Sequence, residues 1–270
     1  MRILITGTSG FIGGVLARQL SKENEVIPFD RMSFDSLMSS KSSETVAADA
    51  IIHCAAVTSI DDCEKSPKDA FIINVYGSYL IARLAAKSNA KHGILLSSGA
   101  VYRPGNMLTE TSELRPSSVY GVTKLLSEDA VLCQDVSFTV LRLFFPYGKE
   151  SPEKQLMKRI INKIRNSEQI TIQGEAGPTI NPLHVNDLAR AVSLALLAKR
   201  KGIFNLGGSE YIALRDLVSM IGKSLHRSAV INSTNGTPDD MNCDYSLFRN
   251  TFGFEPEVKL AQGIRELAGT

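Results

Sequence analysis

The sequence opens with Met1-Arg-Ile-Leu-Ile-Thr-Gly-Thr-Ser-Gly-Phe-Ile-Gly-Gly14, in which a short apolar run ends in glycines and a helical pattern follows. Residues 3–5 predict a buried strand. Gly7 and Gly10 allow the backbone to turn sharply and to approach a ligand, and Gly13 lets the next helix pack against the sheet. The unpaired amides at the start of that helix would face an anion such as a pyrophosphate. A glycine-rich turn without a ligand is the alternative, and the flanking strand and helix disfavour it.

Length and composition indicate an ordinary globular α/β protein. The chain has 270 residues, of which 43% are hydrophobic and 21% charged, so it can bury a large core in one compact unit with two lobes. Its formal net charge is +2 and its basic residues are scattered, which argues against a nucleic-acid partner. We expect a small neutral or anionic ligand instead.

The spacing of the cysteines and the length of the apolar runs indicate the cellular compartment of the protein. Cys54, Cys63, Cys133 and Cys243 show no C-x-x-C spacing, so we expect reduced thiols and neither a metal site nor a disulfide framework. No apolar run reaches the length of a membrane span, and the start of the chain lacks the pattern of a secretory signal. These features predict a cytoplasmic protein with no membrane partner.

The second predicted strand, residues 25–30, ends in an acid that bears on cofactor choice. Asp30 stands twenty residues after Gly10. A carboxylate here accepts hydrogen bonds from a ribose 2′-hydroxyl and repels a 2′-phosphate, which slightly favours NAD over NADP. Arg31 follows directly and could pair with a 2′-phosphate, so NADP stays open. A turn-capping role for Asp30 is the alternative without a cofactor.

Strands and helices alternate along the rest of the first half, which predicts a doubly wound parallel sheet of the Rossmann type. Further buried strands are expected at residues 50–56, 94–102, 138–144 and 202–207, with helices from Pro67 to near Asn89 and from near Ser117. His53, inside one of these strands, is expected to be a core histidine.

After residue 150 the pattern changes to short strands and amphipathic helices. We expect helices at 152–166, 214–225 and 260–267 and a strand at 169–173. The chain is therefore predicted to hold a dinucleotide-binding domain at 1–150, rejoined by 184–207, and a small C-terminal substrate-binding lobe at 151–183 and 208–270.

Three side chains form a candidate acid/base set. Ser98 ends a predicted strand, where open parallel sheets bind ligands, and Tyr120 and Lys124 share one face of the next helix. A tyrosine has a pKa of about 10, which a nearby ammonium and a positively charged nicotinamide would lower. Tyr120 would move the proton, Ser98 would orient the reacting oxygen, and Lys124 could also hold the nicotinamide ribose. Each residue alone has a plain structural explanation, and the order of the motifs favours the catalytic one.

At these residues the chain resembles the extended short-chain dehydrogenases/reductases, in particular the nucleotide-sugar epimerases, dehydratases and 4-ketoreductases. The resemblance covers nearly the full length. Its motifs are Thr6-Gly-Thr-Ser-Gly-Phe-Ile-Gly13, His53-Cys-Ala-Ala56, Asn74-Val-Tyr-Gly-Ser78, Ser97-Ser-Gly-Ala-Val-Tyr102, Tyr120-Gly-Val-Thr-Lys124, Arg142-Leu-Phe-Phe-Pro-Tyr-Gly148, His184-Val-Asn-Asp187, Phe204-Asn-Leu-Gly207 and Phe252-Gly-Phe-Glu-Pro256.

The resemblance implies a catalytic set, a cofactor site and partners. The catalytic residues would be Ser98, Tyr120 and Lys124, with no metal. The substrate would be a nucleotide-linked sugar, and the protein a homodimer formed through the helices that bear Asn74 and Tyr120. The residues implied in cofactor binding are Gly7, Ser9, Gly10, Phe11, Ile12, Gly13, Asp30, Arg31, Ala55, Ala56, Asn74, Tyr120, Lys124 and Phe144.

The chain also departs from the family pattern. The family's 4,6-dehydratases carry an Asp-Glu pair after the catalytic hydroxyl, where this chain has Gly99 and Ala100, so dehydration is not expected. Phe145 stands where many members place an asparagine that contacts the sugar nucleotide, and Ile180-Asn-Pro182 replaces a common Arg-Asp-Phe. The stretch at 31–49 is shorter than the usual strand and helix, which puts the adenine pocket in doubt.

Three functions remain open on the sequence. The first is a reductase that binds NAD(P)H afresh and reduces a 4-keto group of a nucleotide-linked sugar. The second is a 4-epimerase that oxidises C4 transiently and retains its NAD. The third is a dinucleotide-binding sensor without catalysis, which the presence of all three catalytic residues disfavours. We favour the reductase because the usual nucleotide-anchoring positions are altered and Arg31 admits NADPH.

Overall fold

The computed structural model describes residues 1–30, 46–88 and 90–269. Arg31, implied above in cofactor binding, and most of the stretch that follows it lie outside the described residues. The chain divides into two compact units, which are described here separately. The first comprises Met1–Arg103, Ser112–Arg142 and Ala189–Phe204, and the second comprises Pro104–Thr111, Leu143–Leu188 and Asn205–Thr270.

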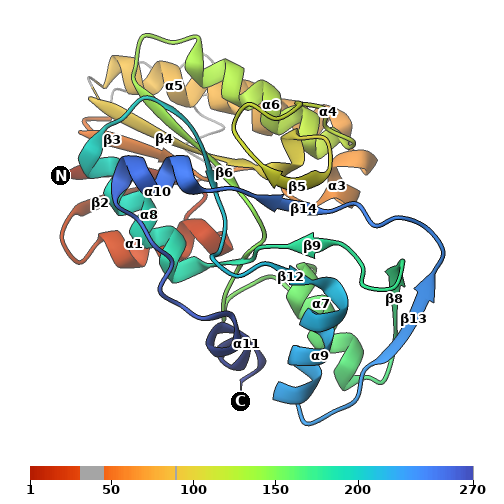
Figure 1. The fold of residues 1–270 in the computed structure, drawn as a ribbon. Helices are drawn as coiled ribbons and strands as arrows, with labels where there is room; N and C mark the ends of the chain where they lie inside the picture. The colour runs from red at the N-terminus through yellow and green to blue at the C-terminus, as the bar shows by residue number, and fades with distance from the viewer. Residues whose placement is uncertain (31–45, 89, 270) are drawn as a thin grey trace. The chain divides into compact units, whose positions relative to one another are not determined.

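The centre of the fold is a six-stranded sheet in the order β11-β6-β4-β3-β1-β2 (Figure 1). The strands are β1 Arg2–Thr6, β2 Glu25–Phe29, β3 Ala50–His53, β4 His92–Ser98, β6 Phe138–Leu143 and β11 Gly202–Leu206. Strand β1 pairs in parallel with both β2 and β3, so Thr6 lies opposite Phe29 on one side and His53 on the other. The strand order therefore reverses at the carboxyl ends of β1 and β3, where doubly wound sheets bind ligands. The predicted α/β, doubly wound parallel sheet is confirmed.

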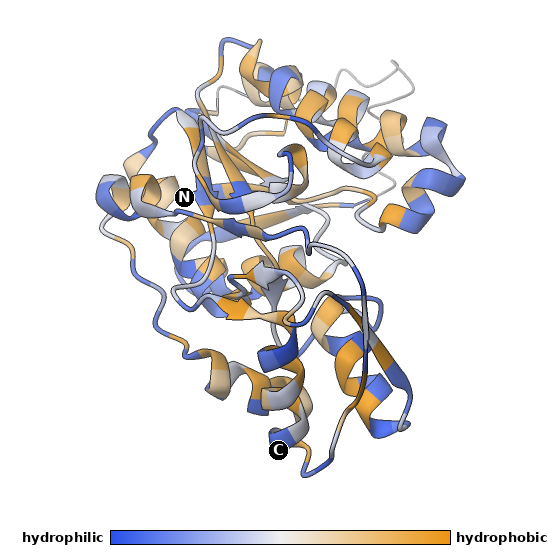
Figure 2. Cartoon of the chain, turned by 45° about the vertical axis from the view of Figure 1, so that its right-hand side comes forward, coloured by the Kyte–Doolittle hydropathy of each residue, from blue (hydrophilic) through white to orange (hydrophobic). Residues whose placement is uncertain are grey.

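Helices cover both faces of this sheet, which explains its apolar strands. Helices α1 and α8 lie on one face and α5 and α6 on the other (Figure 1). Their bounds are α1 Phe11–Leu20, α5 Gly77–Lys87, α6 Val119–Leu132 and α8 Val185–Ala198. Residues 3–5 of β1 have no exposed surface, and Figure 2 shows hydrophobic residues running along the central strands. A strand covered on both faces needs an unbroken apolar run instead of an alternating one.

The helix predicted from Pro67 to Asn89 forms in three consecutive stretches. These are α4 Pro67–Ala70, the π-helical η1 Phe71–Tyr76 and α5. Within η1, the Asn74 carbonyl accepts hydrogen bonds from Ser78 Oγ at 2.5 Å and from Ser127 Oγ at 2.8 Å. Such side-chain donors compete with the amides of the helix for its carbonyls, which accounts for the widened turn.

The second unit holds a four-stranded sheet in the order β12-β9-β14-β5 and the parallel pair β8–β13. Its apolar core includes Ile161, Ile172, Val218 and Ile264, which are fully buried. Its elements are β5 Gly105–Leu108, β7 Pro146–Tyr147, α7 Leu156–Arg165, β8 Gln169–Gln173, β9 Thr179–Ile180, β10 Leu183–His184, β12 Ile212–Ala213, α9 Leu214–Ser224, β13 Val230–Thr234, β14 Met241–Cys243, α10 Ser246–Phe252 and α11 Leu260–Ala268.

Strand β5 is not among the strands expected from the sequence. It pairs with β14, and the Met107 amide donates to Asn242 Oδ1 at 2.8 Å. Two of its four residues are exposed, so no apolar alternation marks it, and its partner lies far along the chain. In the part of the chain that the structure describes, no helix is long and apolar enough to cross a membrane.

A buried ion pair ties strand β6 to helix α6 within the first unit. Arg142 Nη2 and Glu128 Oε2 lie 2.6 Å apart, and each side chain is only 2% exposed. The remaining polar atoms are also bonded, because Ser97 Oγ donates to Glu128 Oε1 at 2.5 Å and Arg142 Nη1 donates to Tyr102 Oη at 2.7 Å. Removing one member of such a pair leaves an uncompensated charge in the core.

We predict that Arg142→Met lowers the free energy of unfolding by about 3–5 kcal/mol, because the buried Glu128 carboxylate loses the guanidinium that is hydrogen-bonded to both of its oxygens. The control is Arg103→Met, which removes an exposed Arg103–Glu113 pair of 3.2 Å and should cost about 1 kcal/mol or less. Urea unfolding at pH 7 measures both variants. An equal loss of unfolding free energy in the two variants would contradict this account of the Arg142–Glu128 pair.

Candidate active site

The glycine turn after β1 is packed closely against the backbone around it. Gly7 has φ +70°, and a Cβ on it would lie 2.8 Å from the Ala55 amide nitrogen, so only glycine fits. A Cβ on Gly13 would overlap the Gly7 carbonyl, so this glycine brings α1 against the turn. The N-cap residue of α1 is Gly10, which offers no side-chain cap to the first amides of the helix. Uncapped amides at a helix start suit an anionic pyrophosphate.

The other residues predicted to bind cofactor fall into three groups. Ser9, Phe11 and Ile12 belong to the turn and to the first turn of α1, and Ala55 and Ala56 follow β3. Asp30 directly follows β2 and is exposed. Phe144 belongs to the second unit, where it is 1% exposed and its amide donates to the Leu206 carbonyl at 3.0 Å.

Asn74 is buried and its side chain is fully engaged within the protein. Its Oδ1 accepts from the Val57 amide at 2.7 Å, and its Nδ2 donates to the Val57 carbonyl at 3.0 Å and to Thr123 Oγ1 at 2.9 Å. These bonds hold the segment after β3 against helix α6. Asn74 therefore holds the Val57 backbone and helix α6 in place beside the candidate site.

The structure brings together all three predicted catalytic residues. Ser98 is the last residue of β4, Tyr120 is in the first turn of α6 and Lys124 is one turn further on. The Ser98 hydroxyl lies near enough to the Tyr120 phenol to lower its pKa. Ser98 Oγ also accepts from the Ala100 amide at 3.2 Å, which fixes the hydroxyl at the strand end.

Helix α6 is held close to β4 by its first turn. Ser118 caps the helix by accepting from the Gly121 amide at 3.1 Å. A Cβ at Gly121 would overlap the Ala100 carbonyl, so glycine permits the close approach that brings Tyr120 to Ser98. Glu64, on α3 Ile60–Lys65, accepts from the Val119 amide at 2.8 Å. Sequence reasoning missed this second cap, because Glu64 is an exposed acid on a separate helix.

The electrostatics of the site differ from the sequence expectation. Burial raises the pKa of Tyr120, and the nearby Ser98 hydroxyl lowers that pKa by less. Contrary to the sequence expectation, Lys124 is not among the groups that lower this pKa. The Lys124 ammonium instead donates at 2.7 Å to the carbonyl of Leu96, which precedes Ser98 on β4. Tyr120 is consequently protonated at neutral pH and suited to give a proton.

Lys124 is a buried cation, 4% exposed. Burial lowers its pKa from 10.5 to about 8, and the nearby Glu128 carboxylate and Cys54 oppose this effect. Lys124 in turn lowers the pKa of His53, whose value of about 3 is due first to burial. A positive charge thus lies close to the carboxyl ends of β3 and β4.

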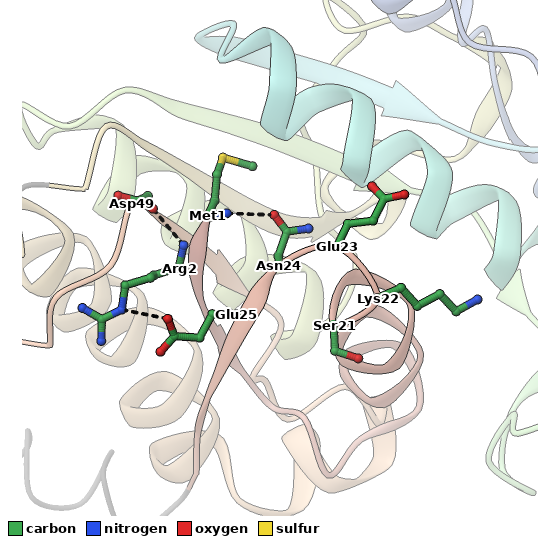
Figure 3. A pocket seen from close by; sticks show the side chains of 8 residues that line it. All are labelled: Met1, Arg2, Ser21, Lys22, Glu23, Asn24, Glu25 and Asp49. Carbon is green, nitrogen blue, oxygen red and sulfur yellow. Dashed lines mark hydrogen bonds and ion pairs between the residues drawn. The ribbon is translucent and has the colours of Figure 1, made fainter.

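An open hollow in the first unit lies at the other end of the sheet (Figure 3). Its polar groups bond one another. Arg2 N donates to Asp49 Oδ2 at 2.8 Å, and the Met1 amine donates to Asn24 Oδ1 at 3.3 Å. The hollow borders the amino ends of β1 and β2, away from Ser98, so it is no part of the candidate site. Its lining residues are Met1, Arg2, Ser21, Lys22, Glu23, Asn24, Glu25 and Asp49.

Comparison with known proteins identifies the family. Residues 3–207 match the model of the NAD dependent epimerase/dehydratase family. The chain belongs to that family. The resemblance to extended short-chain dehydrogenases/reductases is thereby confirmed, and family membership makes the chain an enzyme of the nucleotide-sugar epimerases, dehydratases and reductases.

Individual family members are similar over most of the chain. A dTDP-glucose 4,6-dehydratase of Streptomyces niveus is 25% identical over 98% of this chain and 91% of its own length. A dTDP-4-dehydrorhamnose reductase of Sinorhizobium fredii is 28% identical over 77% of this chain and 73% of its own. The crystal structure of a UDP-glucuronic acid 4-epimerase from Bacillus cereus, with UDP-glucuronic acid and NAD, has a TM-score of 0.85 and 23% identity, and covers 100% of this chain and 98% of its own.

We predict a pH-dependent stability difference between Lys124→Met and the wild type. Between pH 8 and 10.5 the unfolded wild type binds more protons at Lys124 than the folded one, so the wild type gains stability with rising pH and the variant does not. The free energy of unfolding of Lys124→Met, relative to that of the wild type, should therefore fall by about 3 kcal/mol between pH 7 and pH 11. Urea unfolding at the two pH values measures this difference, with the exposed Lys87→Met as control. A pH-independent difference would show that Lys124 titrates normally.

Proposed function

We propose that the protein is an NAD(P)-dependent reductase of a 4-keto group on a nucleotide-linked sugar. The observation that carries the proposal is that Ser98, at the carboxyl end of β4, and Tyr120 lie together, with Lys124 one helical turn away. Tyr120 has a pKa raised above the ordinary value of about 10, so at neutral pH it carries the proton that the reduction of a ketone consumes. The similarity to the reductase from Sinorhizobium fredii also favours reduction over oxidation of the sugar.

The residues divide the reaction between them. Bound NAD(P)H supplies a hydride to the carbonyl carbon. Tyr120 gives its phenolic proton to the carbonyl oxygen as that oxygen gains charge, and Ser98 donates a hydrogen bond that orients the same oxygen. The Lys124 ammonium, bonded to the Leu96 carbonyl, places a positive charge one helical turn from the tyrosinate that remains.

Dehydration is not supported by the residues after Ser98. Gly99 and Ala100 form the short 3-10 helix η2 Gly99–Val101, and neither carries an acid. A dehydratase needs one group to protonate the departing hydroxyl and one to remove a proton from carbon. The relative from Streptomyces niveus is a dehydratase, so similarity over the whole chain does not decide between the family's reactions.

The dinucleotide would be held by the glycine turn and the start of α1. The close packing at Gly7 and Gly13 holds the start of α1 against the turn, and the N-terminus of α1, which has no side-chain cap, suits a pyrophosphate. Asp30 after β2 favours NAD through the ribose hydroxyl, and Arg31 is compatible with NADP. We assign substrate binding to the second unit, residues 151–183 and 208–270 above all.

A 4-epimerase that retains NAD is the second candidate. It is favoured by the similarity to the Bacillus cereus epimerase, whose crystal structure contains NAD and UDP-glucuronic acid. In that reaction Tyr120 would first take a proton from the C4 hydroxyl. The raised pKa of Tyr120 makes this the less favourable starting state.

Deuterium transfer separates the two candidates. The purified protein is incubated with NADH or NADPH deuterated at C4 and with a panel of nucleotide-linked 4-keto sugars. Stoichiometric deuterium in the reduced sugar is the expected result. Interconversion of C4 epimers on tightly held NAD, without net label transfer, would replace the reductase by the epimerase.

We predict that Tyr120→Phe lowers kcat for this reduction by about 10² to 10⁴, because the proton donor is removed. Binding of NAD(P)H should change little. The control is Tyr76→Phe, which alters a tyrosine that is 45% exposed on η1. Wild-type turnover by Tyr120→Phe would rule out the proposed mechanism.

We predict that Gly7→Ala weakens NADH and NADPH binding by about tenfold or more, equivalent to at least about 1.4 kcal/mol. The methyl group would force the turn away from Ala55. Gly253→Ala is the matched control, because Gly253 also has a positive φ, +64°, yet its Cβ would meet nothing within 4 Å. Fluorescence titration measures both affinities. Equal weakening in the two variants would point to backbone strain alone.

We further propose that the enzyme is a cytoplasmic homodimer. Phe71 and Tyr76 on η1 and Leu126 on α6 are 40%, 45% and 38% exposed, a set of large apolar groups on neighbouring helices of the first unit. A second copy that packs on this face would cover them.

We predict that light scattering gives a dimer mass for the wild type and a monomer mass for Tyr76→Glu, because a charge is placed in the covered face. Leu197→Glu is the control, since Leu197 is 71% exposed on α8, outside this face. A monomeric wild type would refute the dimer.

A further inference from the structure

The further inference concerns a chain of buried polar side chains between the glycine turn and helix α6. Its members come from β1, β3, η1, α5 and α6, and each is at most 1% exposed. They are Thr6, His53, Asn74, Ser78, Thr123 and Ser127. The mechanism proposed above uses none of them directly. Buried polar groups that are fully paired fix one arrangement of the elements around them.

The direction of each hydrogen bond follows from counting donors and acceptors. Thr6 Oγ1 accepts from the Cys54 amide at 3.1 Å and from the Ala55 amide at 3.0 Å. Both of its lone pairs are then used, because a hydroxyl accepts at most two bonds. Its own proton must therefore be donated to His53 Nδ1, which lies 2.7 Å away.

The remaining protons are fixed in the same way. A neutral histidine that accepts at Nδ1 carries its proton on Nε2. His53 Nε2 thus donates to Ser78 Oγ at 3.1 Å, and Ser78 Oγ donates to the Asn74 carbonyl at 2.5 Å. A protonated ring would set a second donor against the Thr6 hydroxyl. The pKa of His53, lowered to about 3 by burial and by Lys124, agrees with a neutral ring.

Asn74 continues the chain into helix α6. Its Nδ2 donates to Thr123 Oγ1 at 2.9 Å, and Thr123 Oγ1 donates to the Tyr120 carbonyl at 2.8 Å. Ser127 Oγ makes a second link from α6 to the Asn74 carbonyl, at 2.8 Å. The bonded path therefore runs from the residue before Gly7 to the backbone of Tyr120.

We infer that His53, held as the neutral Nε2–H tautomer, is a positioning residue that couples the glycine turn to the catalytic helix through the chain Thr6–His53–Ser78–Asn74–Thr123. The functional part of this inference rests on the proposed roles of Gly7 and Tyr120. Its structural part, the tautomer and the coupling between turn and helix, stands apart from any sugar substrate.

The experiment compares Thr6→Val with Thr6→Ser. Valine keeps the shape of threonine but removes the hydroxyl, and serine retains it. The matched control is Thr139→Val, because Thr139 on β6 is also fully buried and also bonds a buried histidine, with Oγ1 2.8 Å from His92 Nε2. That pair has no bond to the chain described here.

Two readouts need no sugar. Nitrogen-15 NMR of the histidine rings should show His53 with its proton on Nε2 at pH 7 and at pH 5. Hydrogen exchange of residues 118–124, measured by mass spectrometry, should become at least about tenfold faster in Thr6→Val, stay near the wild type in Thr6→Ser and be unchanged in Thr139→Val. A third readout, NADH affinity, should weaken about tenfold in Thr6→Val only.

The outcomes separate this inference from the proposed function. A proton on His53 Nδ1, or equal exchange of residues 118–124 in all variants, would overturn the inference. Failure of the protein to reduce any 4-keto sugar, with the predicted tautomer and exchange pattern, would overturn the proposed function and leave the coupling intact.

Discussion

The buried ammonium of Lys124 is the constraint on which the surroundings of the site depend. A cation in the interior must be paired or hydrogen-bonded, because desolvation of a charge is costly. Lys124 bonds the Leu96 carbonyl of β4 and faces Glu128 on its own helix. Glu128 is held in turn by Arg142 of β6. The relative placement of β4, β6 and α6 is thus set by charges that have to be satisfied together.

The same placement brings the candidate pair together at the carboxyl end of β4. Because α6 packs closely against β4, Tyr120 lies next to Ser98, and burial raises the pKa of its phenol. The site residues come from several strands and helices. Their side chains keep a fixed geometry only if those elements are held firmly together. The chain of side chains through His53 and Asn74 provides this lock on the side of the glycine turn.

Local signals allowed much of the fold to be predicted, and they pointed to the three residues that the structure brings together in the candidate site. An unbroken apolar strand before Gly7, and a four-residue spacing between Tyr120 and Lys124, are visible in the sequence alone. What the sequence could not supply were contacts between distant residues. Strand β5 pairs with β14 far along the chain, and Glu64 caps α6 from another helix. The direction of the Tyr120 pKa shift was mispredicted for the same reason, since it depends on burial and on where the Lys124 ammonium points.

The central claim is that Tyr120 holds the proton that the reduction consumes. It is tested most directly by carbon-13 NMR of protein labelled at tyrosine Cζ and free of dinucleotide, with Tyr120→Phe used to assign the resonance. The account predicts that Tyr120 stays protonated through pH 9 and titrates above the ordinary tyrosine pKa of about 10. Titration of Tyr120 near neutral pH would show a tyrosinate in the resting protein and would contradict it.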